Sequence, residues 1–112
     1  MSQPIRYAPW FDADVQLRTA RYAEQAGPKV ANRFVDALQA TVTKLANNPC
    51  RGHPAYPKDP DLADLRVIQL VRPFQKYLLY YRIVGEMLIL ERLIYGGRDL
   101  PRRLRESPHE RD

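Results

Sequence analysis

The chain has 112 residues, a net charge of +5 and 45% hydrophobic residues, a size and composition that predict one globular domain over residues 1–112. The single cysteine, Cys50, excludes an intramolecular disulfide, and no apolar run approaches the roughly 20 residues of a membrane-spanning helix, so we expect a cytoplasmic protein that does not bind membranes. Fourteen of the 18 basic residues are arginine, which favours an acidic protein or a nucleic acid as partner.

The N-terminal part of the chain predicts a short strand followed by a helix. Pro4–Trp10 alternates weakly between apolar and polar residues, as a strand does. Phe11–Ala26 has helical spacing, and Asp12 or Asp14 is the candidate cap at its positive end. We expect Gly27 to end this helix.

Pro28–Asn48 is the clearest predicted element, a second helix with a broad apolar stripe. The stripe residues recur at intervals of three and four: Val30, Phe34, Ala37, Leu38, Thr41, Val42 and Leu45. Because the joint between the two helices is short, we expect an antiparallel helical hairpin.

The C-terminal half predicts a loop and then an antiparallel sheet. Prolines and glycines in residues 48–63 indicate an irregular surface loop. Leu65–Val71, Phe74–Val84 and Met87–Tyr95 are rich in β-branched and aromatic residues, as strands are. Gly85-Glu86 fits a two-residue hairpin turn. We expect a three-stranded meander that buries the helical stripe on one face, and a frayed end at 106–112.

Alternation along Phe74–Val84 divides its side chains between two faces of the sheet. The better core face carries Tyr77, Leu79, Tyr81 and Ile83. The other face, which we expect to be open, carries Lys76, Leu78, Tyr80 and Arg82. Basic residues on this open face and after the last strand are the candidate target-binding residues: Arg66, Arg72, Lys76, Arg82, Arg92, Arg98, Arg102 and Arg103. An alternative for Arg66 is an ion pair with Asp64 or Glu91.

The sequence lacks the patterns of metal and nucleophile chemistry. Its two histidines, His53 and His109, are 56 positions apart, and no CxxC or HExxH spacing occurs. Cys50 lies in the predicted loop, only His53 and His109 could serve it as a base, and we expect no catalytic role for it. We therefore predict no metal site and no cofactor, and a function based on binding.

The order of these segments resembles the RelE/ParE superfamily of toxins from bacterial toxin–antitoxin pairs. The resemblance runs from about Ile5 to Leu104 and rests on Phe34–Leu45, Asn48-Pro49 with Gly52, Leu65-Arg66, Phe74 with Tyr77–Ile83, and Leu90–Asp99. It implies an α+β fold of order β-α-α-β-β-β, in which the helical hairpin packs on the C-terminal antiparallel sheet. It also implies a cognate antitoxin that wraps the toxin in a hetero-oligomer.

The superfamily has two main activities, and the residues favour one of them. RelE-like members cut messenger RNA in the ribosome with basic residues on the middle strands, a basic residue after the last strand and a C-terminal tyrosine. In this chain those strand positions fall near Val67, Gln69 and Leu78, and the tyrosine falls near Leu104. Only Arg98 matches the pattern.

The resemblance therefore favours the ParE-like activity, inhibition of DNA gyrase without bond cleavage. The alternative is a ribosome-dependent endoribonuclease, whose clamp and acid/base groups would be Arg66, Lys76, Tyr80 and Arg98. A second alternative is a non-toxic member that only binds its partner.

Overall fold

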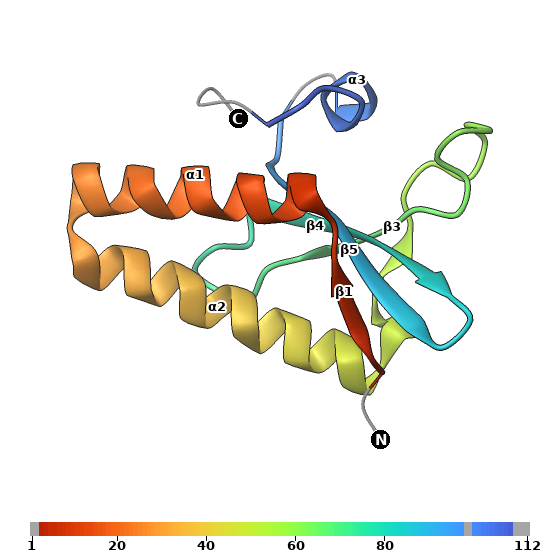
Figure 1. Cartoon of the computed structure of the whole chain (residues 1–112), viewed down its shortest axis with the longest axis horizontal. Coiled ribbons are helices and arrows are strands. Elements are labelled where there is room, and N and C mark those ends of the chain that lie inside the picture. The colour runs from red at the N-terminus through yellow and green to blue at the C-terminus, as the bar shows by residue number, and fades with distance from the viewer. Residues whose placement is uncertain (1–2, 98–99, 109–112) are drawn as a thin grey trace.

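Two long helices lie across one face of a five-stranded sheet in the computed structural model, which describes residues 3–97 and 100–108 (Figure 1). The elements in chain order are β1 (Ile5–Tyr7), α1 (Pro9–Ala26), α2 (Pro28–Asn47), the 3-10 turn η1 (Pro49–Arg51), β2 (His53–Pro54), β3 (Arg66–Gln69), β4 (Tyr77–Val84), β5 (Met87–Tyr95) and α3 (Leu100–Leu104). The α+β class and the helical hairpin that precedes the antiparallel strands agree with the prediction.

The first helix begins earlier than predicted. Proline is favoured in the first turn of a helix because it needs no hydrogen-bond acceptor there, and α1 starts at Pro9 with Ala8 as its extended N-cap. The cap makes no side-chain hydrogen bond, so neither Asp12 nor Asp14 has the predicted capping role. Asp14 is instead buried, with 5% of its surface exposed.

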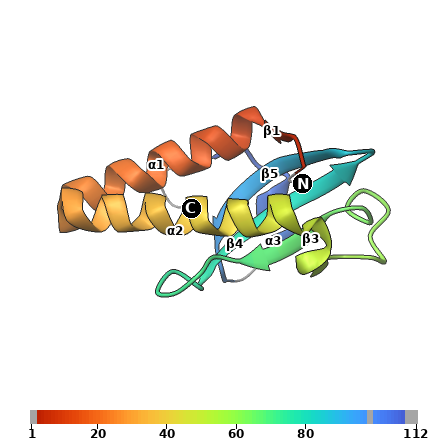
Figure 2. The ribbon, with the colours of Figure 1, turned by 90° about the horizontal axis from the view of Figure 1, so that it is seen from below.

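The apolar stripe of α2 forms the centre of the main core. Phe34, Leu38, Val42 and Leu45 are buried against the sheet, where they meet Leu79, Tyr81, Leu88, Leu90 and Leu93 from β4 and β5. Figure 2 shows both helices on this one side of the sheet. The predicted stripe is confirmed, although Val30 at its start is only half-buried.

The sheet has the strand order β1-β5-β4-β3-β2. The last three long strands form the predicted antiparallel meander, and Gly85 takes a φ of +60° in the two-residue turn that joins Val84 to Met87. β1 pairs in parallel with β5. Residues 48–63 were predicted to be irregular, but they contain η1 and the short strand β2, which pairs antiparallel with β3.

An extra residue interrupts the pairing of β4 and β5. Tyr80 is opposite Arg92 and Tyr81 is opposite Leu90, so Glu91 has no partner of its own. Such a bulge changes which residues of a strand face each side. Leu88 and Leu90 face the helices before the bulge, and Leu93 faces them after it.

The second face of the sheet is covered, which contradicts the predicted open face. A smaller core there contains Leu62, Leu65, Tyr80, Ile94 and Leu104. Leu62 and Leu65 come from the segment before β3, and Leu104 comes from α3, a helix that was not predicted. Tyr80 and Arg92 are therefore only 1% and 3% exposed. No helix in the described part of the chain is long and apolar enough to span a membrane.

Candidate functional site

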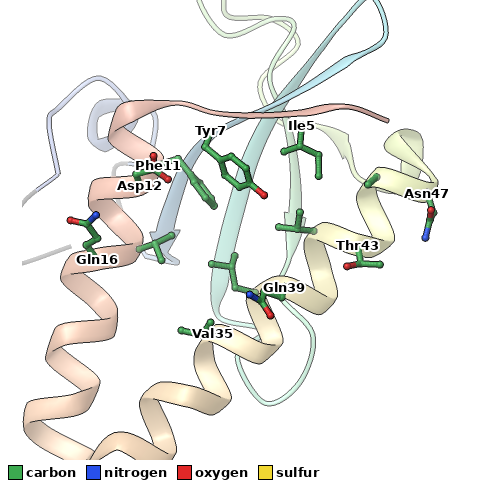
Figure 3. Close-up of a pocket in the computed structure, with 13 residues that line it drawn as sticks. Ile5, Tyr7, Phe11, Asp12, Gln16, Val35, Gln39, Thr43 and Asn47 are labelled. Atoms are coloured by element: carbon green, nitrogen blue, oxygen red, sulfur yellow. The ribbon is translucent and has the colours of Figure 1, made fainter. Parts of the chain in front are cut away.

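A groove of about 720 Å³ lies between β1, α1 and α2, and we call it the hairpin groove. It is lined by Ile5, Tyr7, Phe11, Asp12, Val15, Gln16, Val35, Leu38, Gln39, Val42, Thr43, Ala46 and Asn47. Figure 3 shows Ile5 and Tyr7 projecting from β1 toward α2. Tyr7 is 50% exposed. The groove thus combines apolar walls with uncharged polar groups along α2, a composition suited to a protein segment.

A second groove, of about 690 Å³, lies along β3, and we call it the edge groove. It is lined by Arg51, His53, Val67, Ile68, Gln69, Leu70, Val71, Arg72, Gln75 and Leu78. β1 is at one edge of the sheet, and β2 and β3 are at the other. The two grooves therefore lie at opposite edges of the sheet.

Arg66 and Arg82 are partly exposed, but each is held by neighbouring groups. Arg66 Nη2 donates a hydrogen bond to the Gly52 carbonyl oxygen at 2.5 Å, which ties the turn before β2 to β3. Arg82 forms ion pairs with Asp64 and with Glu91. The sequence analysis gave these two carboxylates as possible ion-pair partners of Arg66. In the structure they pair with Arg82, because β4 lies between β5, which carries Glu91, and β3, which Asp64 precedes.

Arg92 is not part of an exposed basic surface, because its guanidinium is buried in an ion pair with Asp14. Arg92 Nε donates to Asp14 Oδ2 at 2.8 Å and Nη2 donates to Oδ1 at 3.0 Å. The backbone N–H of Leu93 also donates to Asp14 Oδ2, at 2.9 Å. Arg92 Nη1 donates to three C-terminal backbone oxygens, those of Arg103, Leu104 and Glu106.

This network joins α1, β5 and the C-terminal segment. Two parallel hydrogen bonds between a guanidinium and a carboxylate fix both side chains in geometry as well as charge. Glu106, expected in a frayed end, is held through its backbone oxygen. The exposure predicted for Arg92 is thus wrong, because the bulge and α3 enclose its side chain.

Arg72 and Lys76 are exposed in the segment between β3 and β4. Arg72 was predicted there, whereas Lys76 was predicted within a strand that in the structure begins only at Tyr77. Neither has a carboxylate within ion-pairing distance among residues 3–97 and 100–108. Arg102 lies on α3 near Glu106 at 3.8 Å, and Arg103 Nη1 donates to the Tyr95 carbonyl oxygen at 3.0 Å. Arg98 is outside the described residues.

The three described members of the ribonuclease set do not lie together. Arg66 is opposite Tyr81 in the sheet. Lys76 lies in the turn before Tyr77, the first residue of β4, and Tyr77 is four positions from Tyr81, about 14 Å at the rise of a strand. Tyr80 is enclosed in the smaller core, where burial and a hydrogen bond to the Tyr56 hydroxyl raise its pKa far above the ordinary value. A general acid or base must lie within hydrogen-bonding distance of the reacting proton, and these three side chains do not converge on one place where a substrate could bind.

Sequence reasoning missed Asp14 and Arg51. The available signal for Asp14 was its position three residues after Phe11, on the apolar side of its helix, where a charge needs a buried partner. Arg51 was assigned to an irregular loop, but it is the last residue of η1 and lines the edge groove. No group of three or more His, Cys, Asp or Glu residues that could hold a metal ion occurs within the described part of the chain.

The comparisons with known proteins bear on the fold and on the family of the chain. The chain's fold resembles a chain of the chromosomal ParDE TA system from P. aeruginosa, with a TM-score of 0.69, 18% identity, and coverage of 86% of this chain and 98% of that chain. No curated protein sequence matches. The family model described as "ParE toxin of type II toxin-antitoxin system, parDE" matches residues 5–100, which is most of the sequence. The chain therefore belongs to the ParE toxin family of type II toxin–antitoxin systems.

Proposed function

We propose that this ParE family member binds and inhibits DNA gyrase in the cytoplasm, and that a cognate antitoxin neutralises it in a hetero-oligomer. The observation that carries the choice of gyrase over messenger RNA is the separation of Arg66, Lys76 and the buried Tyr80. Without a common acid/base site, the exposed cations serve to hold a target rather than to cut a bond.

Arg72 and Lys76 are the strongest candidates for target contact. Both are exposed and lack a described ion-pair partner, so a partner's carboxylates would meet cations that are not already neutralised. Arg102 and Arg103 on α3 are further candidates, with Arg98 between them and β5 in sequence. Arg66, Arg82 and Arg92 support the fold around this surface through the contacts described above.

A supercoiling assay with purified gyrase and purified chain tests the proposal. We expect inhibition by the chain, and we expect Arg72→Glu combined with Lys76→Glu to raise the concentration for half-inhibition by about tenfold or more, since opposed charges at an interface rim are costly. Lys29→Glu combined with Arg33→Glu is the matched control, because both residues are exposed on α2. Undiminished supercoiling at large excess of the chain would reject gyrase as the target.

The ribonuclease alternative has its own readout. Primer extension on cellular messenger RNA during expression would reveal new cleavage sites if the chain cut RNA in the ribosome. New sites that disappear with Lys76→Ala would replace the gyrase proposal. Growth without arrest, unchanged supercoiling and unchanged messenger RNA would together indicate the non-toxic alternative.

The hairpin groove is the proposed antitoxin site. Its apolar walls and length along α2 suit the apolar face of an amphipathic helix, which would be anchored at intervals of three and four residues. Co-purification with the product of an adjacent small acidic reading frame, where one exists, tests this. We expect Tyr7→Ser to weaken co-purification. Leu17→Ser is the control, because it also replaces an exposed apolar side chain with serine but lies on α1 outside the groove lining, and we expect it to leave co-purification unchanged. Equal retention by both variants would place the antitoxin elsewhere.

A further inference from the structure

The edge groove contains a stretch of strand edge that no other strand of the described sheet covers. The Leu70 N–H donates to the Tyr77 carbonyl oxygen at 3.1 Å. Because the peptide groups of an antiparallel pair alternate between the two sides of a strand, those of Val67 and Gln69 face away from β4. Val67 is opposite His53 of β2, whereas no strand of the described sheet lies beyond Gln69.

Hydrogen bonds hold the segment before β2 away from Gln69. The Tyr81 hydroxyl donates to the Pro49 carbonyl oxygen at 2.8 Å and accepts the Gly52 N–H at 3.1 Å. Arg51 N–H donates to the Asn48 carbonyl oxygen at 3.0 Å. These bonds fold the segment before β2 into η1, so β2 begins only at His53 and no strand residue lies next to Gln69 on that side. At the other end, Val71 N–H is already bonded to Thr41 Oγ1.

The charge around this open edge has one sign. Arg51, His53 and Arg72 contribute to the lining of the edge groove, and none of its lining residues is acidic. Among the residues that the structure describes, no carboxylate lies within ion-pairing distance of Arg51 or Arg72. The rest of the lining is aliphatic or amide, and it contains no Phe, Tyr or Trp.

We propose that the edge groove binds an extended, acidic segment of the protein target, paired through the backbone of Gln69 with carboxylates on Arg51 and Arg72. A peptide added at a sheet edge gains main-chain hydrogen bonds, and its alternate side chains enter the pockets beside the strand. Aliphatic side chains would contact Val67 and Leu78, and acidic ones would contact the two arginines.

A single-stranded nucleic acid fits this groove less well than a peptide does. Grooves that hold single strands combine cations with aromatic side chains on which bases stack, whereas the edge groove contains no Phe, Tyr or Trp and offers one ring, the His53 imidazole. An unpaired peptide N–H and carbonyl oxygen match another peptide backbone directly. A second copy of this chain is also a poor occupant, because Phe11–Val15, in which acidic and apolar residues alternate, is part of the helix α1 and is not an extended segment.

The inference deepens the proposed function, since it expects a protein target, but its test needs no gyrase. Fluorescence anisotropy with the purified full chain would measure binding of a short labelled peptide in which valine and glutamate alternate. We expect the valine–glutamate peptide to bind at least tenfold more tightly than a valine–lysine peptide, and we expect rising salt to weaken it. Peptide binding without gyrase inhibition would support the edge groove as a peptide-binding site and would reject gyrase as the target.

Two variants and one control connect the binding to the groove. Arg51→Gln combined with Arg72→Gln removes both charges from exposed positions and should weaken the peptide about tenfold. Gln69→Pro removes an N–H that faces away from β4, so it should weaken binding while the circular dichroism spectrum keeps its shape. Arg33→Gln, an exposed change on α2, should have no effect.

Three outcomes would overturn the proposal. The first is equal affinity for the glutamate and lysine peptides, and the second is glutamate-peptide affinity that survives the double arginine variant. The third is tighter binding of labelled oligo-dT than of the glutamate peptide, lost in the same double variant, because that result would assign the groove to nucleic acid. A glutamate peptide with proline at alternate positions checks the backbone pairing and should bind more weakly than its parent.

Discussion

Replacement of Asp14 by asparagine should destabilise the fold more than any exposed charge change. The Asp14 carboxylate accepts hydrogen bonds from Arg92 Nε and Nη2 and from the Leu93 N–H, and its side chain is 2% exposed in the ion pair. Asparagine keeps an acceptor for one of these donors but leaves the Arg92 charge without its counterion. Breaking one side of a buried ion pair costs about 3–5 kcal/mol.

That loss is a large fraction of the free energy of unfolding, which is about 5–15 kcal/mol for a domain of this kind. Urea unfolding followed by circular dichroism would measure it. Trp10, the only tryptophan, has the Arg92 guanidinium 5.2 Å from its ring centroid, so its fluorescence reports on the same site. Asp61→Asn is the control, because this carboxylate is 80% exposed and lies 3.6 Å from Arg105. We expect the control to change stability by less than about 1 kcal/mol.

A double-mutant cycle separates the pair from its surroundings. Asp14→Leu and Arg92→Met each leave one buried partner, whereas the double variant replaces both with apolar groups. We expect the double variant to lose clearly less stability than the two single variants added together. If the stability losses of the two single variants simply add in the double variant, or if Asp14→Asn costs less than about 1 kcal/mol, then this network does not stabilise the packing of α1, β5 and the C-terminal segment.

Three further predictions concern the core. Burial, followed by hydrogen bonds to neighbouring tyrosines, raises the pKa of Tyr77 and Tyr80 well above about 10, so both stay neutral in the fold while the unfolded chain ionises. The stabilisation that these two raised pKa values give is complete below pH 10. Above it the free energy of unfolding should fall by about 1.4 kcal/mol per pH unit for each tyrosine. Denaturant titrations from pH 8 to 11 should show this fall, and Tyr80→Phe should reduce it. Gly52→Ala would place a methyl group 2.5 Å from a tyrosine hydroxyl and 2.6 Å from a backbone carbonyl oxygen, and thermal melts should show a loss of about 1–3 kcal/mol; an unchanged melting temperature would contradict the close approach. Thr41→Val should cost about 1–3 kcal/mol in the same assay, because the partly buried Val71 N–H loses its acceptor, and a neutral result would mean that water replaces the hydroxyl.

Local signals made the helices and the meander predictable. The three-and-four spacing around Phe34 and Leu38 reflects a helix that buries one face, and that face is set by neighbours within a few residues. The turn at Gly85 joins strands that are adjacent in sequence. Features of this kind need no knowledge of distant parts of the chain.

The features that were missed depend on contacts between distant residues. Asp14 and Arg92 are 78 positions apart, and Leu62 and Leu104, which share the smaller core, also come from distant segments of the chain. Alternation in one strand showed that Tyr80 and Arg82 share a face, but it could not show that α3 covers part of it. For the candidate site, the place of Arg72 between two strands was predictable from the sequence. Lys76 is exposed in a turn and not on the strand face that was expected, and the roles of Arg66 and Arg82 depended on the strand register.

The bulge at Glu91 has a consequence for how this strand tolerates changes in length. Leu88 and Leu90 reach the main core through even positions, while Leu93 reaches it through an odd one. Deletion of one residue here would turn either half of the strand over, sending leucines to the α3 side or the Arg92 guanidinium into the aliphatic interior. We therefore expect relatives to vary in residue type at this point and to keep the number of residues between Leu90 and Leu93 constant.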